Sequence, residues 1–167
     1  MIGYAPRVRT HTAYIALGSN LGDRRAHIEA AVSALRRREG IEVVRVSELV
    51  ETEPVGPPGQ GPYLNGAAEL STTRSPEELM RTLLRIEREV GRDRATETER
   101  NMPRVIDLDL LLYADRVLDS EGLTLPHPRM HERGFVLAPL ASIAPEARHP
   151  VLHKSVAELL ASLVRKV

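Results

Sequence analysis

Asp107 and Asp109 are the two residues whose type and spacing point most directly to chemistry. They lie in residues 105–113, where apolar side chains alternate with others in the way expected of a β-strand. Both carboxylates would project from the same face of that strand, with their Cα atoms roughly 7 Å apart. The apolar residues expected to share the opposite face are Ile106, Leu108, Leu110 and Leu112.

Two carboxylates this close on a buried strand are unfavourable, because burial and mutual repulsion both penalise the charged forms. A divalent cation would relieve this penalty. Mg²⁺ fits best because it commonly takes one or two carboxylates and shares its other coordination sites with substrate phosphates. The alternative is that the aspartates pair with arginine, for instance with Arg104. The spacing therefore predicts either a magnesium site or an Asp–Arg cluster.

The composition narrows the class of protein. We expect residues 1–11 to form a flexible leader and residues 12–167 to form a single domain, since this length suits one core. The chain has 23 basic and 23 acidic residues and only 3% aromatic residues, which argues against nucleic-acid binding. It has no cysteine and no apolar run long enough for a membrane span or a signal peptide. We therefore expect a monomeric cytoplasmic protein without a membrane partner.

Apolar periodicity and turn residues predict the elements that carry the aspartates. Main strands are expected at 12–17, 41–50, 63–70 and 105–113. Helices are expected at 24–39, 76–90, 136–143 and 155–164. The order β-α-β-β-α-β predicts an α+β protein with a ferredoxin-like core, extended by C-terminal helices into three αβα layers. In this arrangement we expect the aspartate strand to lie inside the sheet, with its charged face open to loops.

Two long loops flank this strand in the sequence. Residues 51–62 contain four prolines and three glycines, and residues 92–100 contain arginines at 92, 94 and 100. Arginine suits phosphate oxygens because its guanidinium group presents a planar fork of donors. The turn at 18–23 lacks the lysine of a phosphate-binding loop. We therefore interpret it as a tight turn in which Asn20 or Asp23 caps the next helix. Carboxylates, arginines and loops together indicate a magnesium-dependent phosphoryl or nucleotidyl transferase.

Five separate blocks of the sequence resemble a known family. They are 13–22 (AYIALGSNLG), 63–65 (YLN), 103–110 (PRVIDLDL), 125–128 (LPHP) and 133–140 (RGFVLAPL). In this order they resemble 6-hydroxymethyl-7,8-dihydropterin pyrophosphokinase of the folate pathway, over nearly the whole chain. The resemblance implies a transfer of pyrophosphate from ATP to the hydroxymethyl group of a reduced pterin, which leaves AMP. The chain departs from the family at Asn101, where some members have a tryptophan, and at Met102, where a small residue is usual.

The resemblance also implies roles for individual residues. The catalytic set is Arg92, Arg104, Asp107 and Asp109, and the two aspartates would hold two Mg²⁺ ions. The residues on the ATP side are Glu87, Leu110, Thr124, His127 and Arg133. Those around the pterin are Thr52, Val55, Tyr63, Asn65 and Phe135, with the ring edge hydrogen-bonded by Asn65 and the ring faces covered by Tyr63 and Phe135. ATP and the reduced pterin would be the only partners.

Two other functions are compatible with parts of the pattern. A two-metal nucleotidyltransferase also uses an Asp-x-Asp strand, but it would release pyrophosphate and leave no AMP. A non-catalytic ferredoxin-like module could bind RNA or a small regulatory molecule. An RNA-binding sheet shows aromatic side chains on its exposed strands, however, and here the exposed face would carry Asp107 and Asp109.

Overall fold

The computed structural model describes residues 7–166, so residues 1–6 of the predicted leader lie outside the described part. The strands are β1 (His11–Ser19), β2 (Ile41–Val46), β3 (Val50–Thr52), β4 (Tyr63–Thr72), β5 (Asp107–Tyr113), β6 (Leu118–Ser120) and β7 (Leu123–Leu125). The α-helices are α1 (Arg24–Arg36), α2 (Pro76–Val90), α3 (Gly134–Ile143) and α4 (Val156–Val164). Two short 3₁₀ helices, η1 (Arg94–Thr96) and η2 (Met130–Glu132), lie in the connections.

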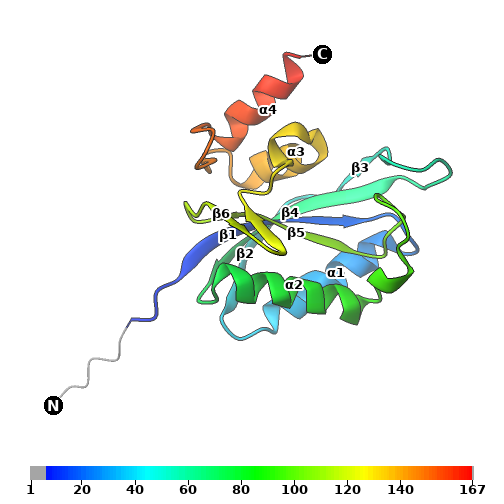
Figure 1. Cartoon of the computed structure of the whole chain (residues 1–167), viewed down its shortest axis with the longest axis horizontal. Helices are drawn as coiled ribbons and strands as arrows, with labels where there is room; N and C mark the ends of the chain where they lie inside the picture. Colours follow the sequence, from blue (N-terminus) through cyan, green and yellow to red (C-terminus); the bar gives the residue numbers. More distant parts are fainter. Residues whose placement is uncertain (1–6, 167) are drawn as a thin grey trace.

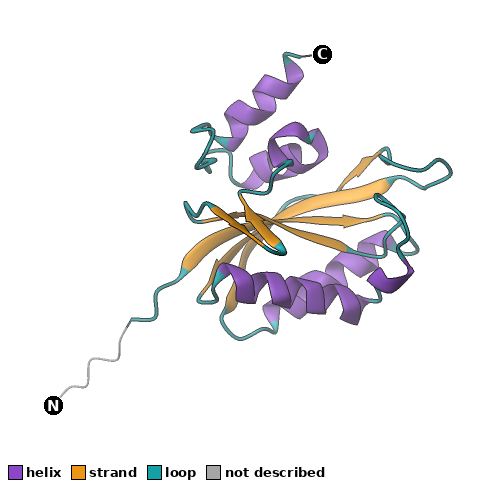
Figure 2. Ribbon diagram, viewed as in Figure 1, coloured by secondary structure: helices purple, strands orange, loops and turns teal. Residues whose placement is uncertain are grey.

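The main sheet is antiparallel and has the order β2-β4-β1-β5, with β3 also paired to β4. Helices α1 and α2 cover one face and α3 lies over the other, with α4 beyond it (Figures 1 and 2). This is the predicted ferredoxin-like core with additional C-terminal helices. The predicted place of the aspartate strand was wrong, because among the described residues 7–166 β5 pairs only with β1 and forms an edge of the sheet. Strand β1 begins at His11, one residue inside the predicted leader.

The predicted strand at 41–50 is two strands, β2 and β3, joined at Ser47. The backbone N–H of Ser47 donates to the carbonyl of Ala67, while its Oγ accepts from the N–H of Ala67. Leu49 then lies over Gly66, where an added Cβ would be only 2.6 Å from the Leu49 side chain. The break is therefore set by a partner on β4, and the local sequence of β2 does not reveal it.

Local signals predicted the starts of α1, α2 and α4 to within one residue, whereas α3 begins at Gly134, two residues before its predicted start. Ser75 and Ser155 each cap a helix in a reciprocal capping box, and Asp23 caps α1 by accepting from the N–H of Ala26. Helix α1 ends at Arg36, three residues before the predicted end, and the chain turns at Gly40 with a positive φ of 78°. The two strands that α1 connects, β1 and β2, lie on either side of β4.

A β-bulge changes the faces of β5. Ile15 is paired with Leu110 and Tyr14 with Leu112, so Leu111 is an extra residue in β5. Leu111 and Leu112 therefore both pack beneath α3 and α4, and the prediction that Leu112 shares a face with Leu110 was wrong. Before the bulge the alternation holds, since Ile106, Leu108 and Leu110 pack with α1 and α2.

Two apolar cores hold the layers together. One lies between the sheet and helices α1 and α2, and it includes Ile15, Leu83 and Ile86. The other lies between the sheet and helices α3 and α4, and it includes Leu137 and Leu140. No helix within residues 7–166 has the length and apolar character needed to cross a membrane.

Candidate active site

The strand register brings three polar side chains onto one face of the sheet. Gly18 of β1 pairs with Asn65 of β4 on one side and with Asp107 of β5 on the other. Ala16, two residues earlier and therefore on the same face, pairs with Asp109. A side chain at position 18 would crowd this row, because a Cβ there would lie 3.2 Å from Oδ1 of Asn65. The prediction that both aspartates project from one face is confirmed.

These side chains line a cavity of about 540 Å³. Ten of the residues predicted from the sequence line it: Thr52, Val55, Tyr63, Asn65, Arg104, Asp107, Asp109, His127, Arg133 and Phe135. They come from β3, β4 and β5, from the loop before β4, from the residues just before β5, and from the segment that leads into the first turn of α3. A pocket of this size suits small-molecule ligands.

Arg92 lies behind the cavity wall and is only 5% exposed. Its Nη1 donates to Oδ1 of Asp107 at 2.8 Å and to Oε1 of Glu87 at 3.0 Å. Its Nε and Nη2 form a fork on the carboxylate of Glu97, at 2.6 and 3.0 Å. Burial alone would lower the pKa of Arg92, but these three carboxylates raise it, so the guanidinium remains charged.

Glu87 is 1% exposed and joins this cluster to the aspartate strand. Its Oε1 accepts from Arg92 and from the backbone N–H of Leu108 at 2.9 Å, while its Oε2 accepts from Nη2 of Arg94 at 2.8 Å. Within the described residues β5 is an edge strand, so the backbone N–H of Leu108 on its outer side has no partner in a neighbouring strand. The carboxylate of Glu87 accepts this hydrogen bond instead. The sequence analysis placed Glu87 on the ATP side, and the structure shows it beneath the site as a support for Arg92.

The two aspartates differ in their surroundings. Asp107 also accepts from Nη1 of Arg104 at 2.9 Å. The Asp–Arg pairing that the sequence left open as an alternative to a metal site is therefore present at Asp107. Asp109 makes no ion pair within residues 7–166. Burial, with a smaller contribution from the charge of Asp107, raises the pKa of Asp109 to about 7. A cation beside Asp109 would favour its ionised form instead.

The donor set fits a metal that shares its ligands with a substrate. Asp107 and Asp109 line one cavity, but within residues 7–166 no three His, Cys, Asp or Glu side chains converge as a metal cage. A metal at the two carboxylates would have to complete its coordination with water or substrate oxygens. This is the usual situation for Mg²⁺, whereas a closed structural zinc site has four protein ligands.

The residues around Asn65 form the less charged part of the cavity. Asn65 is 7% exposed, and its amide N–H donates to the hydroxyl of Thr52. Its Oδ1 thus remains available as an acceptor at the cavity wall. Phe135 lines the same cavity, and the guanidinium group of Arg133 lies over its ring, 5.7 Å from the ring centre. This combination of aromatic rings and amide groups suits a flat polar heterocycle.

His127 follows a hairpin that reaches the outer edge of β5. Its backbone N–H donates to the carbonyl of Leu111 at 2.9 Å, and its Nδ1 accepts from the N–H of Arg129 at 3.2 Å. Burial, followed by the charge of Arg133, lowers the pKa of His127. The ring is therefore neutral near pH 7, with Nε2 as its proton-bearing nitrogen.

Two residues that the sequence analysis did not assign to the site connect its loops. Asn20 is 6% exposed, and its side chain donates to Oε1 of Gln60 at 3.0 Å and accepts from the N–H of Arg104 at 2.7 Å. Gln60 donates in turn to the carbonyl of Asn101 at 2.8 Å. The two loops and the end of β1 are thus held together. The only signal in the sequence was the position of Asn20 directly after a strand.

Two further predicted residues do not line the cavity. Leu110 is 3% exposed and packs in the core with α1 and α2. Thr124 lies exposed on the β6–β7 hairpin, where its hydroxyl donates to Oδ1 of Asp119 at 3.3 Å. Arg100, by contrast, does line the cavity. The predicted contacts of Leu110 and Thr124 with ATP remain predictions.

Comparison with known proteins agrees with this geometry. Residues 14–145 match a family model described as 7,8-dihydro-6-hydroxymethylpterin-pyrophosphokinase (HPPK). The 2-amino-4-hydroxy-6-hydroxymethyldihydropteridine pyrophosphokinase of Bacillus subtilis is 47% identical over 131 residues, which are 78% of this chain and 77% of that protein. The enzyme of the same name from Pseudomonas aeruginosa is 44% identical over 137 residues, 82% of this chain and 83% of that protein.

Some relatives are much longer than this chain. The folic acid synthesis protein fol1 of Schizosaccharomyces pombe is 44% identical over 151 residues, but these cover 90% of this chain and only 20% of that protein. Among solved structures, wild-type HPPK-DHPS of Plasmodium falciparum with pteroate superposes with a TM-score of 0.73 at 13% identity. The match covers 95% of this chain and 45% of that one, and it shows a shared fold.

Proposed function

Because the chain belongs to the 7,8-dihydro-6-hydroxymethylpterin-pyrophosphokinase family, we propose that the cavity above β1, β4 and β5 carries out the family's reaction. That reaction transfers pyrophosphate from ATP to the hydroxymethyl group of 6-hydroxymethyl-7,8-dihydropterin in folate synthesis, and it leaves AMP. The main support for this proposal is the row of paired residues Asn65, Gly18 and Asp107 across β4, β1 and β5. It places an amide suited to a heterocycle and a carboxylate suited to phosphate chemistry on adjacent strands of one cavity.

The pterin would occupy the end of the cavity around Asn65. Its ring edge carries donors and acceptors, which Asn65 and the backbone near Thr52 and Val55 would pair. Tyr63 and Phe135 would cover its faces, since aromatic rings stack favourably on flat heterocycles. The position of Asn65 next to Gly18 lets the ring lie close to the sheet, so that its hydroxymethyl group points toward β5.

ATP would occupy the end of the cavity around the aspartates. Asp107 and Asp109 would hold Mg²⁺, for which we propose two ions, and the metal would neutralise charge on the phosphates. Arg104 and Arg133 line the cavity with fixed positive charge for phosphate oxygens, and His127 offers its Nε2–H. Arg92 is a positioning residue, because its guanidinium lies behind Asp107 and holds that carboxylate in place.

We also infer that one copy of the chain is sufficient and that it works in the cytoplasm, where its co-substrate ATP is made available. A single chain brings the two aspartates, the arginines and Asn65 to one cavity, which supports this proposal. Leu110 would have to contact ATP through its backbone, because its side chain is in the core. Thr124 would reach ATP only if the β6–β7 hairpin moved.

Product analysis tests the proposed function. The protein is incubated with ATP, Mg²⁺ and 6-hydroxymethyl-7,8-dihydropterin, and the nucleotides are separated, with controls that lack pterin or contain EDTA. The proposal expects one AMP for each pterin diphosphate, and neither product in the controls. Formation of ADP would instead indicate transfer of a single phosphoryl group. Formation of pyrophosphate without AMP would indicate a nucleotidyltransferase.

A further inference from the structure

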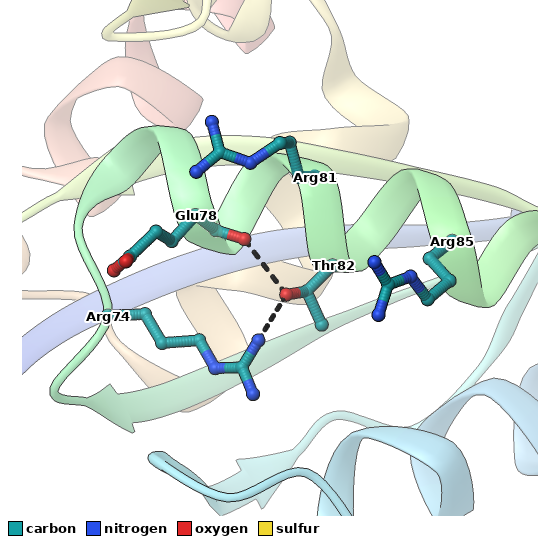
Figure 3. Close-up of a pocket in the computed structure, with 5 residues that line it drawn as sticks. All are labelled: Arg74, Glu78, Arg81, Thr82 and Arg85. Atoms are coloured by element: carbon teal, nitrogen blue, oxygen red, sulfur yellow. Dashed lines mark hydrogen bonds between the residues drawn. The ribbon is translucent and has the colours of Figure 1, made fainter.

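A second cavity, of about 180 Å³, lies on helix α2 away from the active site. It is lined by Arg74, Glu78, Arg81, Thr82 and Arg85, and it shares no lining residue with the cavity around Asp107. Arg74 and Arg85 extend toward Thr82 from opposite sides, while Arg81 lies along the same helix (Figure 3). The guanidinium groups of Arg74 and Arg85 thus flank Thr82, and Arg81 adds a third positively charged residue to the lining.

Arg74 is held firmly in this arrangement. Its Nε and Nη2 donate to the carbonyl of Glu39 at 3.0 and 2.8 Å, and its Nη1 donates to the hydroxyl of Thr82 at 2.6 Å. Thr82 is 6% exposed, and its hydroxyl donates onward to the carbonyl of Glu78. The guanidinium retains one N–H on each terminal nitrogen, because five N–H groups are present and three are used. These two donors are held in place before any ligand arrives.

The positive charge at this cavity is not balanced by ion pairs. Within residues 7–166, no carboxylate forms an ion pair with Arg74, Arg81 or Arg85. The carboxylate of Glu78 accepts from the backbone N–H of Ser75 at 2.8 Å and caps α2. Three positive charges and this one negative charge leave +2 on the lining. Arg81 and Arg85 are also four residues apart on one helix, where like charges are destabilising.

We propose that this cavity is a second anion site, which binds a phosphate group as a dianion. A phosphate dianion carries the charge that the lining lacks, and its oxygens match the forked donors of arginine. The cavity has room for it, since a single water molecule takes up only about 30 Å³ of liquid volume. The ligand is either free phosphate or a phosphate monoester. The site lies outside the proposed active site and does not depend on that function.

The test uses amide resonances of the intact protein during a titration with inorganic phosphate at constant ionic strength. The amide of Thr82 reports on this cavity, and the amide of Asp109 reports on the active site. The test variant is Arg81→Gln with Arg85→Gln, because both side chains are exposed on α2. The matched control is Arg88→Gln, which removes an exposed arginine of the same helix that does not line the cavity.

We expect saturable shifts at Thr82 in the wild type and in Arg88→Gln, and a dissociation constant at least tenfold higher in the double variant. Formation of AMP should be the same in all three proteins, which separates this site from the proposed function. A parallel titration with AMP identifies the source, since tighter binding than phosphate at Thr82 indicates a monoester and equal or weaker binding indicates free phosphate. Equal phosphate titrations in the double variant and the control would overturn the proposal. An equal shift caused by sodium chloride would also overturn it.

Discussion

The carboxylate of Glu87 accepts a hydrogen bond of 2.9 Å from the backbone N–H of Leu108, the residue between the two aspartates. Glu87 belongs to α2 and Leu108 to β5, so this bond joins the helix to the edge strand at the level of the active site. The same carboxylate accepts from Arg92, which holds Asp107. The position of the Asp107 and Asp109 carboxylates thus depends on a buried residue that does not line the cavity.

Substitution of Glu87 should therefore reduce both stability and activity. In Glu87→Gln the buried guanidinium of Arg92 loses one carboxylate, and breaking a buried ion pair in this way costs about 3–5 kcal/mol. Urea denaturation should show a decrease of this size in the free energy of unfolding, with a parallel decrease in kcat. Glu77→Gln, at an exposed position on the same helix, should change stability by less than about 1 kcal/mol. A Glu87→Gln protein as stable as the control would show that this cluster does not support the fold.

Asn20 and Gln60 should show energetic coupling, because their side chains are joined directly by a 3.0 Å hydrogen bond. The comparison requires Asn20→Ala, Gln60→Ala and the double variant. A typical hydrogen bond contributes about 0.5–1.5 kcal/mol, so a coupling of this order is expected in the free energy of unfolding. The single variants should also raise KM for both substrates, since both loops lose their anchor. Strictly additive effects would mean that the two loops are held independently.

Asn65→Ala should weaken pterin binding and spare ATP. The loss of one hydrogen-bonding group that leaves its partner unsatisfied costs about 1–3 kcal/mol, which corresponds to a 5- to 150-fold increase in the dissociation constant. Calorimetric titrations of the variant with the pterin and with an ATP analogue provide the measurement. Val55→Ala is a useful control, because its proposed contact uses the backbone, and its pterin affinity should stay within about threefold of the wild type. Equal losses for both ligands in Asn65→Ala would contradict the proposed role.

His149 should make the fold sensitive to acid. Its Nδ1 accepts from the N–H groups of Val151 and Leu152, and burial, followed by His131 and His153, lowers its pKa below 6.5. Below about pH 6.5 the unfolded chain then binds more protons at this residue than the folded chain, so stability should fall as the pH falls.

Thermal unfolding at pH 7.5 and pH 5.5 measures this effect. The difference in Tm between the two pH values should be smaller in His149→Gln than in the wild type, since Gln does not titrate. His27→Gln, at a partly exposed position on α1, should keep the wild-type difference. If His149→Gln also kept it, the acid sensitivity would have to arise from other groups.

The sequence predicted features that depend on local signals or on a repeated alternation. The capping boxes at Ser75 and Ser155 and the outward projection of Asp107 and Asp109 were predicted correctly, because each depends on residues within a few positions. Ten of the fourteen residues that the family resemblance assigned to the site line the cavity. Neither kind of information required the strand order.

Features that depend on partners far along the chain were missed. The bulge at Leu111 is visible only from the pairing with β1, and the break at Ser47 depends on Ala67 and Gly66 of β4. Asn20 was considered as a helix cap, but Asp23 makes that bond and Asn20 contacts loops around 40 and 80 residues away in the sequence. Propensity carries no information about such contacts.

The central claim is that Asp107 and Asp109 serve the transfer of pyrophosphate, and Asp109→Asn tests it most directly. The substitution keeps the shape of a partly buried side chain and removes its charge, so the protein should fold, as circular dichroism can verify. A metal ion held by these carboxylates would contribute several kcal/mol of charge stabilisation, so AMP formation from ATP and the pterin should fall by at least about a hundredfold. Glu121→Gln, which removes an exposed carboxylate beyond β6, should keep the wild-type rate. A folded Asp109→Asn protein that forms AMP at a rate near that of Glu121→Gln would contradict the account.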